Sequence, residues 1–226
     1  MFSKVFLAGS GTNPFPPRFA YMAAHFSPYG KGLSHLPEGL PEGSVILLDD
    51  SMEPKGHDPD MVAEQLAELV ERFSPFGVLL DFQRSVTGEL RAMAERIAKA
   101  LPCPVGVTEG YAKNLGCPVF LPPPAVNKGL EDYIAPWKEQ GVFLEIAPEG
   151  LEITVTEAGS HFASVPLVPG LPLEDKRLHC HYNVEVLADK AVFTICRYRE
   201  DLAALVQEAE NLGVLGCVGL YSELAK

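Results

Sequence analysis

The chain has 226 residues, with 18 Lys and Arg against 30 Asp and Glu, so its formal net charge at pH 7 is −12. Hydrophobic residues make up 47% and charged residues 21% of the sequence, which excludes the disordered and fibrous classes and predicts one globular domain over residues 1–226. The acidic excess argues against a nucleic-acid partner and against an anionic membrane surface, because both bind basic surfaces.

Cysteine usage and the apolar stretches indicate a compartment. The chain has five cysteines, none of them in a CxxC pair, and Cys196 and Cys217 lie in apolar runs where a reduced thiol packs as a small hydrophobic group. The N-terminal apolar stretch is too short for a signal peptide, and no later run reaches the roughly 18 apolar residues of a membrane span. We therefore expect five free thiols and a cytoplasmic location.

Short apolar runs that end in polar residues recur along the chain, at residues 4–9, 44–50, 77–83, 104–109, 118–122, 141–148, 191–198 and 216–221. Continuous apolar runs are typical of strands that are buried on both faces. Residues 60–73, 88–101 and 200–212 have the apolar spacing of helices, and the last of these segments ends at Gly213, as a helix C-cap would. Alternating strands and helices predict parallel βα units, and eight strands predict a closed α/β barrel, a short (β/α)8 barrel of TIM type.

Two stretches depart from this alternation. Residues 151–168 alternate in polarity with a turn at Gly159, and residues 183–198 resemble a second hairpin with a turn at 188–190, so each predicts a β-hairpin inserted in the C-terminal half. Either arm of the second hairpin could then be the seventh barrel strand. Residues 10–43 are rich in Pro and Gly and predict an irregular first connection.

Polar side chains at the C-terminal ends of the predicted strands form the candidate site, because barrels of this class place their chemistry there. Carboxylates accept hydrogen bonds from hydroxyl groups, and aromatic rings stack on C–H faces. An acidic and aromatic set with few cations therefore fits a neutral sugar or polyol. The residues that we expect to line the site are Asp50, Asp81, Gln83, Arg84, Glu109, Tyr111, Tyr198 and Tyr221.

Other strand-end carboxylates have structural interpretations. Glu145 is flanked by apolar residues, so we expect it to be buried against Arg84 or Arg197. Helix capping is an equal alternative to a site role for Asp49, Asp58 and Glu223.

A metal site or a nucleophilic cysteine has little support. His179 and His181 would share one face of a strand, but no third histidine lies near another strand end. The thiols lie in strands or beside prolines, with no histidine paired to them. Since no phosphate-binding glycine motif is present either, we expect neither a metal nor a cofactor.

The strand at residues 76–83 reads FGVLLDFQ. With residues 44–75 before it, this segment resembles the glycoside hydrolase family 18 (chitinase-type) barrels, in which an apolar strand and a helix lead into a strand ending Asp-Gly-x-Asp-x-Asp-x-Glu. Gly77 matches the family glycine and Asp81 the last aspartate. Leu79 stands in place of the first inner aspartate, and Gln83 in place of the catalytic glutamate. This strand is the third in the predicted order, whereas the family carries its motif on the fourth.

The resemblance implies a glycan ligand and a hydrolytic mechanism, but this chain lacks the catalytic glutamate that the mechanism needs. In the family, the glutamate protonates the glycosidic oxygen and the N-acetyl group of the substrate is the nucleophile. An amide has no acidic proton, so with Gln83 at that position a rate factor of about 10²–10⁴ is lost. The acid could instead be Asp50 or Glu109, paired with Asp81. Tyr111 and Tyr221 would then be sugar platforms.

Three functions remain open from the sequence. The first is a glycoside hydrolase-like barrel that binds or slowly hydrolyses an oligosaccharide, and the second is a non-catalytic barrel that binds a glycan or a small polyol. The third is a lyase or isomerase for a small acid, which needs a lysine or phosphate-binding glycines at the strand ends. Only Lys113 and Lys128 lie near those ends, both in predicted loops. The sequence does not give the oligomeric state.

Overall fold

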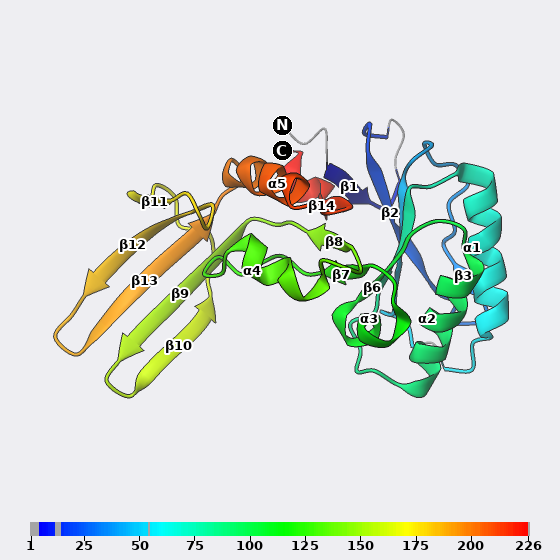
Figure 1. Ribbon diagram of the computed structural model, residues 1–226, viewed down its shortest axis with the longest axis horizontal. Coiled ribbons are helices and arrows are strands. Elements are labelled where there is room, and N and C mark those ends of the chain that lie inside the picture. Colours follow the sequence, from blue (N-terminus) through cyan, green and yellow to red (C-terminus); the bar gives the residue numbers. More distant parts are fainter. Residues whose placement is uncertain (1–4, 12–14, 54, 226) are drawn as a thin grey trace.

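Eight parallel strands close into a barrel in the computed structural model, which describes residues 5–11, 15–53 and 55–225 (Figure 1). The barrel strands are β1 (Val5–Gly9), β2 (Phe19–Phe26), β4 (Val45–Asp49), β5 (Gly77–Asp81), β6 (Val105–Thr108), β7 (Val119–Leu121), β8 (Val142–Glu145) and β14 (Gly216–Leu220). Each pairs in parallel with the next, and β1 pairs with β14 to close the ring. The predicted (β/α)8 barrel is therefore confirmed. Lys4, at the start of the first predicted strand, lies outside the described residues.

The second barrel strand, β2, lies inside the stretch that the sequence predicts to be irregular. It pairs with β1 on one side and with β4 on the other, and the short strand β3 (Leu33–Ser34) adds antiparallel to its end. The pairing with β4 shifts register between Tyr21 and Ala24. The strand was missed because three of its eight residues are alanines, which are weak strand formers, and because Pro- and Gly-rich segments flank it. With β2 counted, β5 is the fourth barrel strand, which is the position that carries the family 18 motif.

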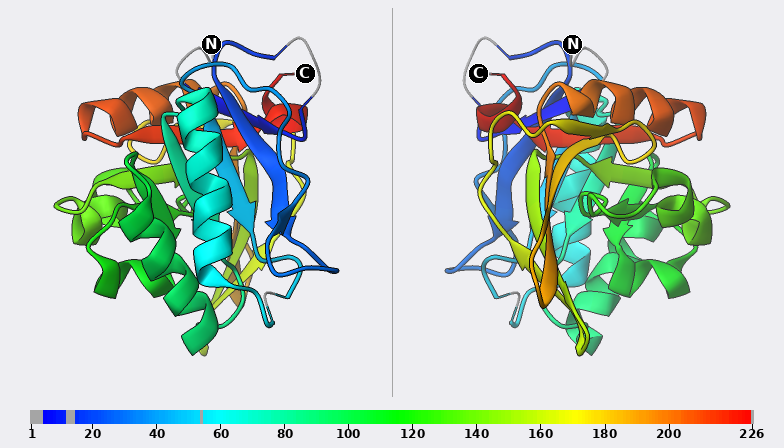
Figure 2. Two further views of the ribbon diagram at one scale, coloured as in Figure 1. Left: turned by 90° about the vertical axis from the view of Figure 1, so that its right-hand side faces the viewer. Right: turned by 90° about the vertical axis from the view of Figure 1, so that its left-hand side faces the viewer.

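The chain between β8 and the last barrel strand forms a separate antiparallel sheet, so the predicted seventh strand is wrong. Its strands are β9 (Glu149–Thr156), β10 (Gly159–Ser164), β11 (Leu173–Asp175), β12 (Cys180–Val186) and β13 (Lys190–Arg197), in the spatial order β10-β9-β13-β12-β11. Both predicted hairpins are present. However, β13 pairs antiparallel with β12 and β9, and therefore neither arm of the second hairpin can join the parallel barrel. The inserted sheet lies beside the barrel in Figure 1 and is seen nearly edge-on in Figure 2.

Helices cover part of the barrel. They are α1 (Pro59–Phe73), α2 (Gly88–Ala100), α3 (Glu109–Leu115), α4 (Leu130–Ile134) with a 3-10 turn at Ala135–Trp137, α5 (Asp201–Asn211) and α6 (Tyr221–Leu224). Asp58 caps α1, since its carboxylate accepts a hydrogen bond from the main-chain N–H of Asp60 at 3.0 Å. Within the described residues, the connections that follow β1 and β2 contain no helix. No helix in this part of the chain is long and apolar enough to cross a membrane.

The barrel interior is packed at its N-terminal end. The rings of Phe6 and Phe76 stack at 5.4 Å, and Phe76 meets Phe143 edge-on at 6.1 Å. Gly106 makes room for this packing, because a Cβ atom there would lie 2.6 Å from the Leu79 side chain. Side chains therefore fill the barrel at the N-terminal ends of its strands, and the polar residues at the C-terminal strand ends surround its mouth.

All five cysteines lie in the described residues and are free thiols. Cys217 and Cys180 are the most strongly perturbed, because burial raises the pKa of Cys217 to about 12 and that of Cys180 to about 11.

Candidate functional site at the barrel mouth

Two carboxylates occupy the centre of the mouth. Asp81 ends β5 and Glu145 ends β8, and both side chains line one small cavity of about 80 Å³. The other walls of this cavity are apolar, with Met22, Phe120 and Val218 among them. The two acids therefore share a confined chamber with little water to solvate their charges.

Burial and like charges raise the pKa of both groups. For Asp81 the largest cause is burial, followed by the repulsion of Asp49 and Asp50, which a hydrogen bond from Gln83 partly offsets. For Glu145 the causes are burial, then Asp81, then Glu223. Neither group forms an ion pair with a lysine or arginine within the part of the chain that the structure describes. The chamber thus favours the protonated carboxylic acid more than water does.

Gln83 covers Asp81 on the outer side of the chamber. Its side-chain Nε2 donates to Asp81 Oδ1 at 3.2 Å and to Oδ2 at 3.3 Å. Leu79 lies in the barrel interior, Asp81 lines the chamber, and Gln83 lines the cavity at the mouth. Residues 79, 81 and 83 thus face the inside of the barrel in turn, as the resemblance to family 18 implies. Gln83 can therefore donate and accept hydrogen bonds at the mouth, but it cannot supply a proton.

Asp50 holds the loop that carries Gln83. This residue is 3% exposed, and its two carboxylate oxygens accept from the main-chain N–H of Gln83 at 3.0 Å and of Arg84 at 2.9 Å. The Arg84 side chain completes the clamp by donating to the carbonyl oxygens of Asp50 at 2.7 Å and Ser51 at 3.0 Å. The structure thus brings Asp50, Gln83 and Arg84 together with Asp81, and it gives Asp50 the contacts of a positioning residue.

Glu109 and Tyr111 lie on the far side of Gln83. Glu109 is the exposed first residue of α3 and lines a cavity of about 450 Å³ that also contains Asp81 and Glu145. Tyr111 is only 2% exposed, and its ring packs edge-on against Phe82 at 5.7 Å. A sugar therefore cannot stack on the Tyr111 ring, contrary to the expectation from the sequence, because the ring is buried. Its buried hydroxyl has no hydrogen-bond partner among the described residues.

Tyr198 lies away from the mouth, at the end of β13 in the inserted sheet. Its hydroxyl donates to the carbonyl oxygen of Val168 at 2.5 Å and accepts from the main-chain N–H of Leu171 at 3.3 Å. Sequence reasoning placed Tyr198 at the mouth because it took β13 for a barrel strand. The structure does not bring it to the cavities that contain Asp81.

The expected pairing of Glu145 with an arginine is also wrong. Arg84 is held by Asp50 and Ser51, as described above. Arg197 is fully buried and donates to the carbonyl oxygens of Pro124, Leu178 and His179, which joins the inserted sheet to the loop after β7. Glu145 is therefore the mouth residue that the sequence analysis assigned to the fold rather than to the site.

The remaining candidate groups have structural contacts. His179 contacts Glu208, and Nδ1 of His181 lies 3.3 Å from Asp201, so the two imidazoles face different carboxylates. No group of three or more metal-ligating side chains occurs among the described residues.

The two lysines considered for a lyase or isomerase site lie over aromatic rings. Lys113 lies over Trp137 at 5.9 Å, and Lys128 lies over Tyr133 at 5.3 Å. Neither lysine lines the cavities that contain Asp81.

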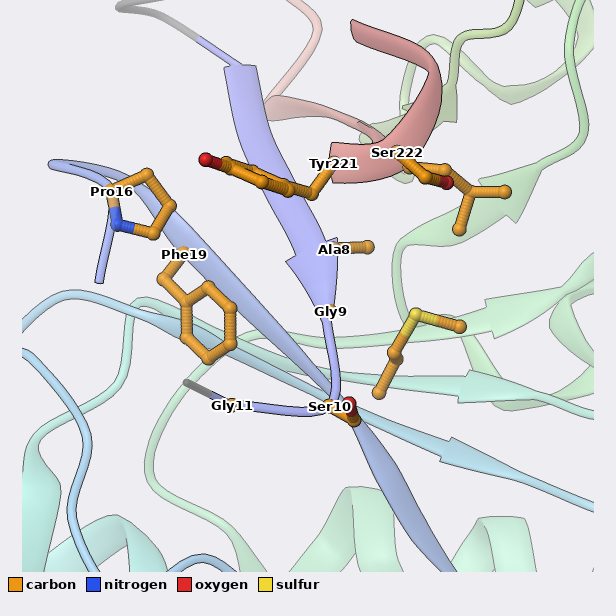
Figure 3. Close-up of a pocket in the computed structure, with 10 residues that line it drawn as sticks. Ala8, Gly9, Ser10, Gly11, Pro16, Phe19, Tyr221 and Ser222 are labelled. Atoms are coloured by element: carbon orange, nitrogen blue, oxygen red, sulfur yellow. The ribbon is translucent and has the colours of Figure 1, made fainter. Parts of the chain in front are cut away.

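A third cavity, of about 540 Å³, lies between β1, β2 and α6 (Figure 3). Figure 3 shows the Tyr221 ring, Pro16 and Phe19 bordering one space, with Ser10 and Gly11 at its base. Tyr221 is 52% exposed, so its ring is available to a ligand. Phe19 was missed in the sequence because it belongs to the unrecognised strand β2.

The three cavities adjoin one another. The Tyr221 cavity and the central chamber share Met22 and Leu220, and the chamber shares Asp81 and Glu145 with the Glu109 cavity. Together they form one groove that crosses the mouth, with the two carboxylates at its centre. We call this feature the mouth groove.

Comparisons with known proteins reveal the fold. No protein-family model matches the sequence, and no curated protein sequence is detectably similar. Solved structures of family 18 type do match. A mutant GH18 chitinase from Cycas revoluta in complex with (GlcNAc)4 is 12% identical, with a TM-score of 0.53 over 95% of this chain and 93% of the other.

Two further structures agree with this match. Human YKL-39, a pseudo-chitinase with retained chitooligosaccharide binding, is 12% identical, with a TM-score of 0.51 over 96% of this chain and 91% of its own. A chitinase from Chromobacterium violaceum is 10% identical, with a TM-score of 0.51 over 89% of this chain and 85% of its own. The chain thus resembles the family 18 barrels in fold, as its sequence indicates.

Proposed function

We propose that the protein binds a glycan in the mouth groove and that Gln83 makes it a poor hydrolase. The observation that carries this proposal is the groove itself, in which two carboxylates lie between apolar walls and an exposed tyrosine ring. A sugar chain offers hydroxyl groups to carboxylates and C–H faces to rings, so an elongated groove of this composition matches an oligosaccharide.

The structural likeness supports the class of glycan. The Cycas revoluta chitinase was solved with (GlcNAc)4, and YKL-39 is described as a pseudo-chitinase that retains chitooligosaccharide binding. We therefore propose N-acetylglucosamine oligomers as the first ligands to test. A cytoplasmic location stays a prediction from the sequence.

Gln83 is the reason to expect binding with little turnover. Departure of the leaving alkoxide needs a proton, and an amide that donates to Asp81 cannot give one. The same amide can still hydrogen-bond a sugar hydroxyl, so the substitution removes proton transfer and leaves binding intact.

A second candidate function, slow hydrolysis, is favoured by the raised pKa of Glu145. A carboxylic acid that holds its proton at higher pH can act as a general acid, and it shares the chamber with Asp81. Glu109, which also lines the mouth groove, remains a second proposed donor, whereas the oxygens of Asp50 are taken by main-chain N–H groups.

Calorimetric titration with the N-acetylglucosamine tetramer tests the binding proposal. We expect Tyr221→Ala to weaken binding about tenfold, equal to about 1.4 kcal/mol, and Tyr221→Phe to bind like the wild type because it keeps the ring. If the wild-type protein does not bind the tetramer, N-acetylglucosamine oligomers are excluded as ligands.

Turnover of the same tetramer tests the proposed cause of inactivity. We expect Gln83→Glu to hydrolyse the tetramer faster than the wild type, by up to about 10²-fold. If the wild type itself turns over well, and Glu145→Gln abolishes this activity while Glu109→Gln does not, Glu145 is the acid and slow hydrolysis replaces simple binding.

A further inference from the structure

The last inward-facing layer of β4, β5 and β8 consists of carboxylates. On each of these strands, the final residue is acidic, and the residue two positions before it is an apolar member of the barrel interior. The acidic residues are Asp49, Asp81 and Glu145. Asp49 and Asp81 are direct neighbours in the register of β4 and β5. Because side chains alternate between the two faces of a strand, all three carboxylates face the barrel mouth.

A side cavity of about 380 Å³ extends the mouth groove toward β4. Asp49 lines this side cavity, and Asp81 lines it together with the central chamber and the cavity that contains Glu109. The oxygens of Asp50, which also borders the side cavity, are taken by main-chain N–H groups. The other carboxylates along this space are those of Asp49, Asp81, Glu109 and Glu145, so negative charge is spread along the groove.

The cavities offer little positive charge to balance these groups. Arg84 is the only lysine or arginine among the described residues that line them, and its side chain donates to the carbonyl oxygens of Asp50 and Ser51. Burial is the largest cause of the raised pKa of Asp81 and of Glu145, and repulsion from nearby carboxylates raises both further. A cationic group bound among the carboxylates would relieve this repulsion.

A buried hydroxyl group at the same groove independently indicates a polar ligand. Tyr111 lines the cavity that contains Asp81 and Glu109, is 2% exposed, and has a hydroxyl with no hydrogen-bond partner among the described residues. An unpaired buried polar group is costly, and a ligand with polar groups can supply the missing partner. The phenol oxygen can accept a hydrogen bond from an N–H donor.

An organic amine fits this distribution of charge better than a metal ion. No group of three or more metal-ligating side chains occurs in the part of the chain that the structure describes, so the carboxylates do not converge on one point. At the other end of the groove, the exposed ring of Tyr221 can stack on a sugar. A chain of sugar rings that carries several ammonium groups matches both features.

We infer that the glycan of the mouth groove carries free amino groups, as an oligomer of glucosamine does, and that it binds in preference to a neutral N-acetylglucosamine oligomer. Its ammonium groups donate charge-assisted hydrogen bonds to the carboxylates of the groove, and its C–H faces stack on Tyr221. The inference rests on the proposed function, because it takes a glycan to be the ligand of the mouth groove.

Calorimetric titration of the full chain with the glucosamine tetramer and with the N-acetylglucosamine tetramer tests the inference. At about pH 6.5, an amine with the pKa of an ordinary α-amino group, roughly 7.7–8.0, is protonated. We expect the Kd of the glucosamine tetramer to be at least about tenfold lower than that of the N-acetylglucosamine tetramer. Added sodium chloride should shrink this difference, because salt screens the attraction. Tetralysine, which carries the charges without the sugar rings, should bind at least about tenfold more weakly than the glucosamine tetramer.

Asp49→Asn tests whether the carboxylates of the groove cause the preference. Asp49 Oδ1 accepts from the main-chain N–H of Ser51 at 2.8 Å, and asparagine keeps this acceptor. The variant should raise the Kd of the glucosamine tetramer about fivefold and leave that of the neutral tetramer within about twofold. Asp189→Asn is the matched control, because it removes the same charge from an exposed turn between β12 and β13, and it should change neither Kd by more than about twofold. Circular dichroism establishes that both variants are folded.

The possible failures are distinguishable. A wild type that binds the N-acetylglucosamine tetramer as tightly as the glucosamine tetramer, or more tightly, would overturn the inference and leave the proposed glycan function standing. Equal effects of Asp49→Asn and Asp189→Asn would also overturn it, since the preference would then come from the overall acidity of the chain. Tetralysine that binds as tightly as the glucosamine tetramer would overturn the assignment to a sugar. A wild type that binds neither tetramer would refute the proposed function, and the inference with it.

Discussion

Glu145→Gln is predicted to stabilise the protein at neutral pH. Burial and the charges of Asp81 and Glu223 raise the pKa of the Glu145 carboxyl above its ordinary value of 4.5. The folded chain therefore binds this proton more tightly than the unfolded chain does. The free energy of unfolding should fall as the pH rises from about 4.5 through the raised pKa, and it should stay low above that value.

The sign of the effect follows from the direction of the pKa shift. Because the ionised Glu145 carboxyl is disfavoured in the folded chain, removal of its charge should raise the free energy of unfolding at neutral pH by more than the roughly 0.5 kcal/mol that surface substitutions usually change it. A glutamine at this position can also donate a hydrogen bond to Asp81, which replaces a repulsion by an attraction.

Urea denaturation of the wild type and of Glu145→Gln, at neutral pH and at the ordinary pKa of glutamic acid, measures this difference. The matched control is Glu139→Gln, an exposed residue, which should change stability by no more than about 0.5 kcal/mol at either pH. The gain for Glu145→Gln should shrink at the lower pH, because the carboxyl of the folded chain then carries less of the charge that the substitution removes. A loss of stability in Glu145→Gln at neutral pH would refute the reasoning, since it would mean that the charge has a stabilising partner.

Three more variants or assays follow from the structure. Asp50→Ala should destabilise the protein by about 3 kcal/mol in urea denaturation, because two main-chain N–H groups lose their acceptor, and Asp50→Asn should lose less because it keeps one acceptor. Arg197→Met should lower the free energy of unfolding by about 3 kcal/mol or more in the same assay. Arg177→Met, which removes an exposed ion pair, should lower it by at most about 1 kcal/mol. Equal losses in the two variants would contradict the role of Arg197 as a buried link between the inserted sheet and the barrel. Thiol titration should count five free thiols after denaturation without a reductant, and Cys217 and Cys180 should react only slowly in the native protein.

The barrel was predictable from the sequence because most of its strands are buried on both faces and read as continuous apolar runs. The exception, β2, shows the limit of this signal. Three of its eight residues are alanines, which are weak strand formers, and Pro- and Gly-rich segments flank it, so only its pairing with β1 and β4 identifies it. The reverse error occurred at β13, whose apolar run resembles a barrel strand although its partners are antiparallel.

The candidate site was predictable in part for a related reason. Asp81 and Gln83 are visible as the end of an apolar strand, and Tyr221 follows the last one. Glu145 also ends a barrel strand, two residues after the inward-facing Phe143, and this spacing was the available signal for its place in the chamber. The burial of Tyr111 depends on side-chain packing against Phe82, which no local pattern indicates.

The central claim is that a glycan binds across the barrel mouth, and amide chemical-shift mapping with the N-acetylglucosamine tetramer tests it most directly. We predict that the shifted amides cluster at Asp81, Gln83, Glu145 and Tyr221, and that the shifts saturate with added tetramer. Shifts confined to the inserted sheet or to the packed N-terminal end of the barrel, or the absence of any shift at saturating tetramer, would contradict the claim.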